Sequence, residues 1–371
     1  MLKSPLAAAL LAAALSPAVV AAQGHTLIES ESGSLRIVNR AQFRFTREMP
    51  DGDVRLTGTD GPGEGKGAFR IRRAKTELTG WVWFKNLTYE LQLSWAGPEP
   101  GASTQTPLED LILMWDVKGD RRFRVSGGQF KVPLGRQEMT SSTYLQFADR
   151  DILSGEFTRG RDLGLLVDGL VAGGKVEYAA GMFNGNPASR LGNDNQAFQY
   201  NARVVLQPFG SVRYSESDFE SRASVAPAHR ALVAFGLGLE HNDLHGAGSR
   251  VNDYSTTIVS GDVVLKSHGL SLFGEYFGRH RNPETGPSFR SDGWHAQAGY
   301  FLIRDRLEAA VRHARFDASA APDDDVKETG GALNYFIRKH YLKLQGDVRR
   351  LENENRGTID HEIRLQSQVV F

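Results

Sequence analysis

The feature that most constrains this chain is an alternation of apolar and polar residues with a period of two. From residue 86 to residue 95 the even positions are polar and the odd positions, beginning with Leu87 and ending with Trp95, are apolar. Residues 362–369 alternate in the same way, interrupted only by Ser367. No stretch after residue 23 sustains the 3.6-residue period of a helix. Since successive side chains of a strand point to opposite faces, we predict a chain built from β-strands.

About sixteen segments show this pattern, and each has roughly the ten residues that a tilted strand needs to cross a bilayer. The segments are 35–47, 68–80, 82–95, 108–118, 121–130, 162–171, 174–184, 196–208, 230–241, 255–266, 269–279, 292–303, 306–316, 327–338, 341–351 and 361–371. An even number of strands is what single-chain bacterial barrels have.

The connections between these segments alternate between short and long. Short ones lie at 119–120, 172–174, 267–268 and 304–305, and long ones at 48–67, 96–107, 131–161, 184–195, 242–254, 280–291 and 317–326. This asymmetry is typical of periplasmic turns and extracellular loops. Residues 209–229 break the rule, and we interpret them as an enlarged periplasmic turn whose length the sequence does not explain.

Closure of the strands into a barrel follows from the backbone. Mean hydropathy is −0.37 and 24% of the residues are charged, which excludes a helical membrane protein. In lipid every backbone N–H and C=O group needs a partner, so a sheet can span only as a closed barrel. We therefore predict an all-β fold: a single-domain transmembrane antiparallel β-barrel of about 16 strands over residues 23–371. A soluble, secreted β-rich binding protein is the more remote alternative.

The first 22 residues have the layout of a signal peptide. Lys3 precedes an Ala/Leu run at residues 6–15, Pro17 breaks that run, and small residues end at Ala22. We predict cleavage after Ala22 and export to the outer membrane of a Gram-negative bacterium. Lys3 is the only charge in this segment, so 43 bases (44 minus 1) and 44 acids remain, a net charge of about −1. This balance gives no support to nucleic-acid binding, and the absence of cysteine excludes thiolate chemistry.

Several short segments carry a resemblance to a known family. They are Arg72-Arg73-Ala74, Gly128-Gln129-Phe130-Lys131-Val132-Pro133 with Glu138 and Thr140-Ser141-Ser142, Arg161-Asp162-Leu163-Gly164, residues 178–185, Gln297-Ala298-Gly299-Tyr300-Phe301 and residues 366–371. Together they resemble the phosphate-selective porin O and P family. The resemblance implies a 16-stranded, usually trimeric porin that passes anions such as phosphate or pyrophosphate. It also implies contacts with membrane lipid and lipopolysaccharide, and recognition of Phe371 by the outer-membrane assembly machinery.

Selectivity in a wide pore depends on the residues at its narrowest point. The longest connection, about 131–161, is the candidate for a loop that folds inward and forms a constriction. It contains Lys131, Arg136, Arg150, Arg159 and Arg161 together with four acidic residues. Arginine can bind phosphate through forked hydrogen bonds, and lysine contributes a point charge.

Parity places further basic side chains in the lumen, because a charge on the lipid face at mid-depth would cost about 2–4 kcal/mol. These candidate pore-lining residues are Arg40, Arg44, Arg203, Arg312 and Lys343, with Arg349 and Arg364 on the same basis. The competing interpretation is that they pair with wall carboxylates and only keep the lumen hydrated. By resemblance, Lys131, Arg72 and Arg73 are the expected anion contacts.

The family's phosphate-specific members present a dense run of arginines near the fifth loop, where this chain has only Arg250 and Lys266. A general, non-selective diffusion porin therefore stays open as the alternative. We expect no catalytic residue, cofactor or metal site. Gly61 to Gly67 lacks the Ser or Thr of a phosphate-binding P-loop. His241 with His245, and the acidic run 323–325, are interpreted as solvated surface.

Overall fold

The computed structural model describes residues 24–51, 67–96, 107–186, 192–193, 195, 197–221, 231–244, 253–319 and 324–371. The expected signal peptide, the glycine-rich segment before Gly67, Asp323 and His245 lie outside these residues. No helix among the described residues is long and apolar enough to cross a membrane.

Sixteen long strands form a closed antiparallel barrel, which confirms the predicted fold class. They are β2 (Ser34–Met49), β3 (Gly67–Val82), β4 (Phe84–Ser94), β5 (Leu108–Asp116), β6 (Arg124–Lys131), β7 (Arg161–Val171), β8 (Val176–Phe183), β9 (Gln199–Leu206), β10 (Leu232–Leu244), β11 (Tyr254–Ser267), β12 (Leu270–Pro283), β13 (Phe289–Ile303), β14 (Leu307–Asp317), β15 (Asp325–Arg338), β16 (Leu342–Asn353) and β17 (Thr358–Val370). Each overlaps one predicted segment. The ring closes where β17 pairs with β2, for example Leu365 with Phe45.

Side chains alternate across the wall as the period of two predicts. On β10, Leu237 and Leu239 are 68% and 50% exposed on the outer face, whereas the alternating residues Gly236, Gly238 and Glu240 are buried on the inner face. Short turns join the strands at one rim. His268 and Gly269, with φ values of 54° and 91°, join β11 to β12 as the two left-handed residues of a tight hairpin turn.

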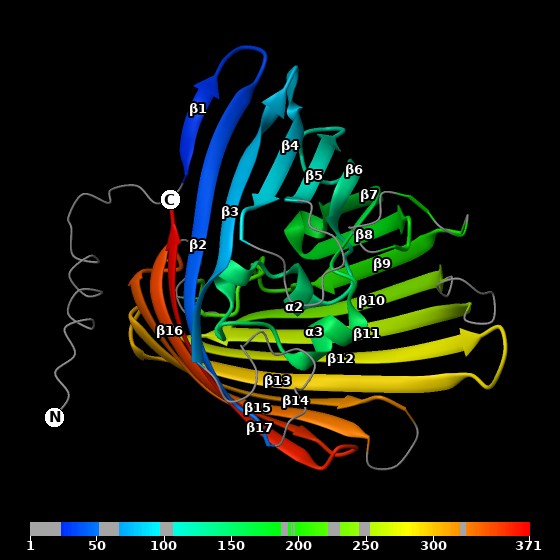
Figure 1. Cartoon of the computed structure of the whole chain (residues 1–371). Helices are drawn as coiled ribbons and strands as arrows, with labels where there is room; N and C mark the ends of the chain where they lie inside the picture. Colours follow the sequence, from blue (N-terminus) through cyan, green and yellow to red (C-terminus); the bar gives the residue numbers. More distant parts are fainter. Residues whose placement is uncertain are drawn as a thin grey trace.

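A short strand that the sequence did not predict, β1 (His25–Glu29), pairs with the beginning of β2. It lies on the same edge of β2 as β17 and starts beyond the end of that strand, where Phe371 and Asn39 exchange backbone hydrogen bonds of 2.6 and 2.9 Å. In Figure 1 the C-terminus lies beside β1 and β2. All five residues of β1 are exposed, so they show no alternation that a sequence pattern could detect.

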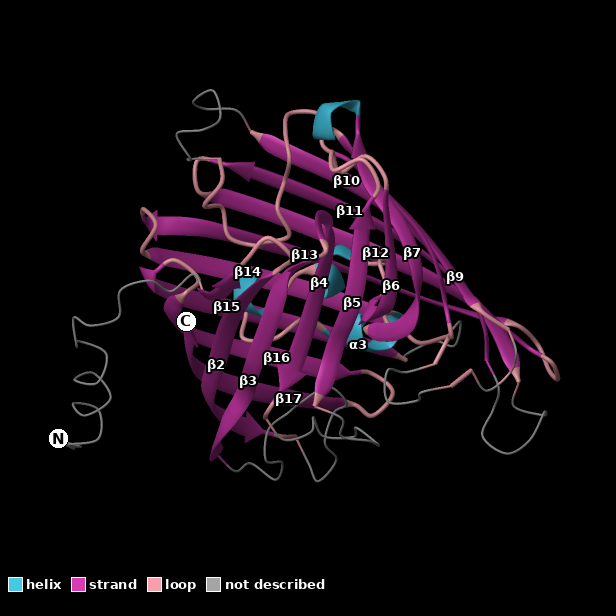
Figure 2. Ribbon diagram, turned by 90° about the horizontal axis from the view of Figure 1, so that it is seen from above, coloured by secondary structure: helices cyan, strands magenta, loops and turns pink. Residues whose placement is uncertain are grey.

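Two connections fold into the interior of the barrel. The inner loop, residues 132–160, carries α2 (Arg136–Met139), the 3₁₀ turn η1 (Ser142–Tyr144) and α3 (Ile152–Phe157), and Figures 1 and 2 show its helices inside the ring of strands. A further 3₁₀ turn, η2 (Ala172–Gly174), joins β7 to β8. The inner turn, residues 207–221, belongs to the connection between β9 and β10. Its contacts inside the barrel account for a length that the sequence left unexplained.

Candidate functional site in the lumen

The inner loop is fixed to the wall by two small apolar clusters. Leu134, Leu153 and Phe157 pack against β11, β12 and β14, and the rings of Phe157 and Phe277 stack with centroids 5.2 Å apart. Phe147 packs against Ala310 and Ala332. At the start of α3, the carboxylate of Asp151 accepts hydrogen bonds from the backbone N–H groups of residues 153 and 154, at 2.9 and 3.2 Å. This N-cap stabilises a helix of only six residues.

The inner turn binds the inner loop through buried polar contacts. Glu216 accepts hydrogen bonds from the backbone N–H of Gln146 at 2.7 Å and from the side-chain amide of Gln137 at 3.1 Å. The guanidinium of Arg136 donates to the carbonyl groups of Val212 and Arg213 at 3.1 and 2.9 Å. It also lies 4.5 Å from the centroid of the Tyr214 ring. The two segments thus form one connected body inside the barrel.

This body is attached to the strands that follow the inner turn. Lys266 of β11 contacts Glu220 at 2.9 Å, and Ser217 donates to Glu308 of β14 at 2.9 Å. The ring of Phe219 packs against the rings of Phe301 and Phe336, with centroids 4.8 and 5.0 Å apart. The half of the lumen bounded by β9–β17 is therefore occupied by protein, and we call it the closed half.

The other half of the lumen, bounded by β2–β7 and one flank of the inner loop, holds a cavity of about 380 Å³. We call it the open half. Seven basic and three acidic side chains line it. The bases are Arg40, Arg73, Lys75, Arg124, Lys131, Arg150 and Arg161, and the acids are Glu77, Glu90 and Asp110. Bases therefore outnumber acids on the surface of this cavity, although Glu109, Glu138 and Asp168 next to it pair with Lys75, Lys131 and Arg124. A surface rich in bases favours anions.

Next to the cavity, several arginines converge on one carboxylate of the inner loop. Asp149 contacts Arg44, contacts Arg73 at 2.8 Å and Arg72 at 3.2 Å, and has Arg364 at 4.0 Å. Burial opposes ionisation of Asp149, but the guanidinium groups outweigh it and hold the pKa of this carboxyl well below its usual range. An ionised carboxylate surrounded by guanidinium groups occupies the kind of position that an oxyanion would take.

Residues 46–370 match the family model described as phosphate-selective porin O and P. The chain belongs to this porin family. None of the curated protein sequences matches it. The anion-selective porin from Comamonas acidovorans has a similar structure, with a TM-score of 0.64 and 12% identity, over 91% of this chain and 100% of that one.

The outer-membrane channel DcaP of Acinetobacter baumannii is similar with a TM-score of 0.62 and 10% identity, over 92% of this porin and 99% of that chain. The trimer form of OmpT from Vibrio cholerae is similar with a TM-score of 0.58 and 10% identity, over 92% of this porin and 100% of that chain. At these identities the structural likeness shows the fold, and the family match carries the conclusion that the chain is an outer-membrane porin.

The structure divides the basic residues singled out from the sequence of this porin into two groups. Lys131, Arg73 and Arg40 line the cavity, and Arg72 lies beside it at Asp149. The other five are no more than 3% exposed and hold the inner loop or the inner turn; they are Arg136, Arg44, Arg203, Arg312 and Lys343. For example, Arg203 donates to the carbonyl of Leu134 at 2.7 Å, and Lys343 to that of Leu145 at 3.0 Å.

Arg72 and Arg73 face the same way although they are consecutive. A β-bulge explains this arrangement, because Gln42 pairs with Arg73 and Phe43 pairs with Ile71, so that Arg72 is an extra residue on β3. Both side chains are therefore buried on the inner face. Beyond the bulge the inner positions of β3 continue with Lys75, which contacts Glu109 at 2.5 Å and which the sequence analysis missed.

Lys131 and Arg150 hold the end of α2 at the edge of the cavity. Lys131 contacts the carbonyl of Glu138 and lies 3.4 Å from that of Thr140, to which Arg150 donates at 2.7 Å. Burial disfavours the ionised form of Glu138, but Arg150 and then Lys131 outweigh burial and lower the pKa of this carboxyl. Both bases therefore position the inner loop as well as line the cavity.

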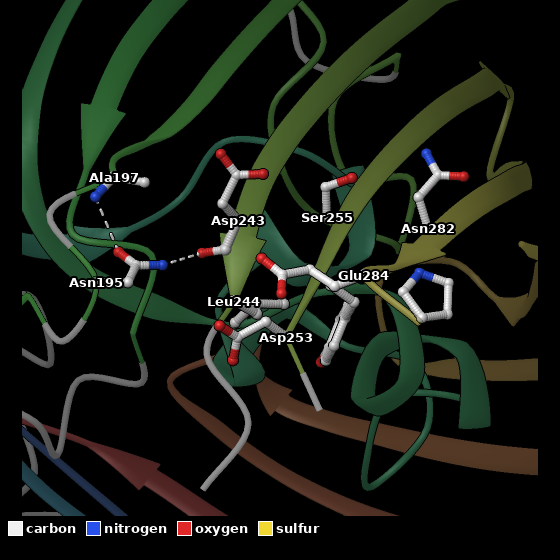
Figure 3. A pocket seen from close by; sticks show the side chains of 10 residues that line it. Asn195, Ala197, Asp243, Leu244, Asp253, Ser255, Asn282 and Glu284 are labelled. Atoms are coloured by element: carbon white, nitrogen blue, oxygen red, sulfur yellow. Dashed lines mark hydrogen bonds between the residues drawn. The ribbon is translucent and has the colours of Figure 1, made fainter. Parts of the chain in front are cut away.

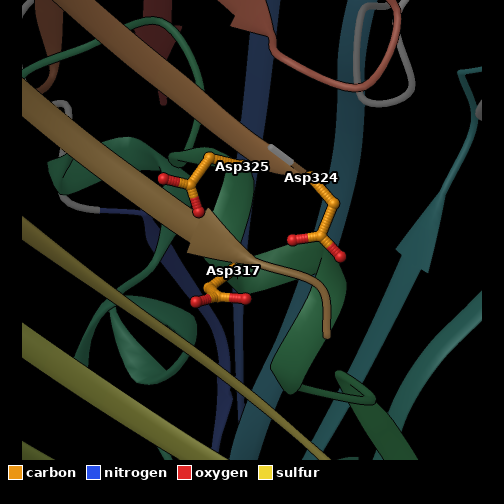
Figure 4. A group of neighbouring side chains, drawn as sticks. All are labelled: Asp317, Asp324 and Asp325. Carbon is orange, nitrogen blue, oxygen red and sulfur yellow. The ribbon is translucent and has the colours of Figure 1, made fainter. Parts of the chain in front are cut away.

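Two acidic features lie at the rim formed by the longer connections. The carboxylates of Asp317, Asp324 and Asp325 come within 4.8 Å of one another, and Arg315 binds Asp325 at 2.5 Å (Figure 4). A cavity of about 240 Å³ lies between the ends of β10, β11 and β12, lined by Asp243, Asp253 and Glu284 among others (Figure 3).

His241 is exposed on the outer wall, where its ring lies 3.0 Å from the hydroxyl of Thr257.

Proposed function

We propose that this porin is a passive diffusion channel for small anions and that they pass through the open half of the lumen. The observation that carries the proposal is the lining of the cavity, where seven bases face three acids. Net charge over the whole chain is zero, so this excess is a local property of the lumen. A cationic lining raises the local concentration of anions and lowers that of cations.

The ion pairs at this cavity should keep a permeating anion from binding too tightly, as transport requires. Arg161 binds Asp110 through two hydrogen bonds of 2.9 and 2.7 Å, and Lys75 binds Glu109. A permeating anion must compete with these carboxylates at each base. Competition weakens every single site, and a channel needs sites that bind weakly enough to release the ion.

Phosphate and pyrophosphate are the proposed preferred solutes within this class. Arg72 and Arg73 carry planar guanidinium groups, which suit the tetrahedral oxygens of phosphate better than they suit chloride. Their convergence on the carboxylate of Asp149 supports an oxyanion-binding role for this corner of the lumen. The general, non-selective porin is the outcome to be tested against.

The test is the reversal potential of purified protein in planar bilayers under a KCl gradient. We expect discrete channels whose reversal potential has the sign of chloride permeation, and partial block when phosphate or pyrophosphate is added. Channels without ion preference would leave the porin fold intact and contradict the anion assignment. Anion-preferring channels that phosphate does not block would contradict only the phosphate assignment.

Assembly as a homotrimer, cleavage after Ala22 and recognition of Phe371 by the assembly machinery belong to the same proposal. The family membership and the trimeric form of the Vibrio cholerae neighbour support the trimer. Light scattering of the detergent-extracted protein would give the mass of the assembly. A monomer as the only stable species would contradict this part of the proposal.

A further inference from the structure

One wall of the open half is apolar, although the inner face of a barrel strand is usually polar. Ile112 and Met114 occupy successive inner positions of β5, and both line the cavity and are partly exposed. Phe130 near the end of β6 and Leu166 of β7 line the same cavity. We call these four residues the apolar wall. Chloride and phosphate have no apolar part that this surface could contact, so the proposed function does not account for it.

Packing makes the apolar wall continuous across three neighbouring strands. Ile112 packs against a buried cluster that contains Phe130 and Leu166. Ser126 of β6 lies between Met114 and Leu166, because it pairs with both of them. Ser126 is 1% exposed and therefore adds almost no polar surface between its neighbours. A solute in the cavity thus meets one apolar surface rather than isolated apolar groups.

The inner loop brings two further apolar groups to the same cavity. Met139 ends α2 and is partly exposed, and the side chain of Tyr144 in η1 is exposed. The ring of Tyr144 packs edge-on against the ring of His340, with centroids 5.1 Å apart, which fixes its orientation. An apolar group in the cavity therefore has partners both on the barrel wall and on the inner loop.

Arginines lie on both sides of the apolar wall along the direction of the strands. Arg161 is the first residue of β7 and precedes Leu166 by five positions, which is about 17 Å along a strand. Arg124 lies on the other side, because it pairs with Asp168, two positions after Leu166. One terminal nitrogen of Arg124 lies 3.5 Å from the sulfur of Met114. An anion that moves between the two arginines therefore passes the apolar wall.

The lining of the cavity suits an anion that carries an apolar body. Its volume of about 380 Å³ lies in the range of pockets that hold small organic ligands, about 300–1,000 Å³. We propose that the open half prefers organic carboxylates with a compact aromatic or branched aliphatic group. The bases attract the carboxylate, and the apolar wall removes the hydrocarbon part from water. This inference rests on the proposed anion channel and adds a preference that phosphate does not share.

The test compares sodium acetate with sodium benzoate as blockers of the chloride current through the purified porin in planar bilayers. Both anions are monovalent and ionised at pH 7, because carboxyl pKa values lie near 4. We expect benzoate to halve the current at about a tenfold lower concentration than acetate. Gluconate controls for size, since it is at least as large as benzoate but polar, and it should block no better than acetate.

The double variant Ile112→Thr with Met114→Gln tests the apolar wall directly, because it makes the wall polar while nearly preserving the shapes of the two side chains. We expect the preference for benzoate over acetate to fall from about tenfold to about threefold. Phosphate is the control solute, and its block should change less than twofold. Met139→Gln approaches the same cavity from the inner loop and leaves the strands unchanged. It should lower the preference about twofold, and it keeps the test valid if the double variant does not fold.

The outcomes separate this inference from the proposed function. A channel without anion preference would overturn both of them. An anion-selective parent in which acetate or gluconate blocks as well as benzoate would overturn this inference alone. A benzoate preference that stays unchanged in the folded variants would do the same, because it would place the apolar contact elsewhere.

Discussion

The two halves of the lumen contain the same kinds of charged residues in different surroundings. In the closed half, the side chains of Arg203, Lys266 and Arg312 are 2%, 0% and 0% exposed. In the open half, those of Arg40 and Arg161 are 21% and 20% exposed. Parity assigns Arg40, Arg203 and Arg312 to the lumen alike. Burial decides whether such a residue holds the interior body in place or remains available to a solute.

The difference in burial also changes what each ion pair contributes to stability. A partly exposed pair contributes about 0–1 kcal/mol, because water screens it and its side chains lose freedom. Removing one partner of a buried pair leaves an uncompensated charge and costs about 3–5 kcal/mol. Removing a charge from the closed half should therefore mainly lower the stability of the protein. Removing a charge from the open half should mainly change its ion selectivity.

Arg203→Leu should have the largest effect. Arg203 and Asp262 form a pair at 2.5 Å whose side chains are 2% and 0% exposed, so the variant leaves Asp262 buried and unpaired. We expect a loss of about 3–5 kcal/mol in the free energy of unfolding, measured by urea unfolding in detergent. The matched variant in the open half is Arg161→Leu, which should lose less stability, because the Arg161 side chain is 20% exposed and Asp110 keeps a hydrogen bond from Gln92. Arg161→Leu should also reduce anion preference. Equal losses would contradict the comparison.

Asp149→Asn tests the boundary between the two halves. The variant removes the carboxylate on which Arg72, Arg73 and Arg44 converge, and so raises the positive charge beside the cavity. We expect phosphate to block the channel at a concentration about tenfold lower, which corresponds to about 1.4 kcal/mol of tighter binding. Asp324→Asn at the rim is the control and should leave the block unchanged. An unchanged block in Asp149→Asn would place the phosphate-binding position elsewhere.

Much of the fold could be predicted from the sequence, because a barrel wall imposes strict alternation on every strand. Each of the sixteen predicted segments overlaps a strand, and the inner parity of Arg203, Arg312 and Lys343 agrees with their burial. Two features do not follow from alternation. The bulge at Arg72 breaks the period of two, and β1 is too short and too exposed to show it.

The division of the lumen could not be predicted, because it depends on contacts between segments distant in sequence. Arg136 of the inner loop binds the carbonyls of Val212 and Arg213, and Lys266 binds Glu220. A connection of twenty residues indicates only that a turn is enlarged. Its direction into the barrel depends on buried partners such as Glu308 and Phe336, which alternation identifies only as inner-facing.

Lys131→Met should have a smaller effect than Asp149→Asn. Lys131 is one of seven bases in the lining, and its amino group also holds the carbonyls of Glu138 and Thr140. We expect the anion-to-cation permeability ratio to fall about two- to threefold, because the other six bases remain. Lys175→Met, in an exposed turn, is the matched loss of charge and should not change the ratio. An unchanged ratio in Lys131→Met would show that this lysine holds the inner loop but does not contribute to anion selectivity.

The smallest of these effects is expected from acidification, which should leave the inner loop in place down to about pH 4.5. Asp149 and Glu138 have pKa values below their usual range, because arginine and lysine groups outweigh the burial of both carboxyls. A carboxyl whose pKa is lower in the folded state stabilises the fold above its unfolded pKa, which is about 4, and loses this contribution only as pH falls through the lower folded value. The anchor should thus persist from pH 7 to about pH 4.5, with constant single-channel conductance and noise. If open-channel noise rises across this range while the barrel stays folded, these two carboxyls do not hold the inner loop against the open half.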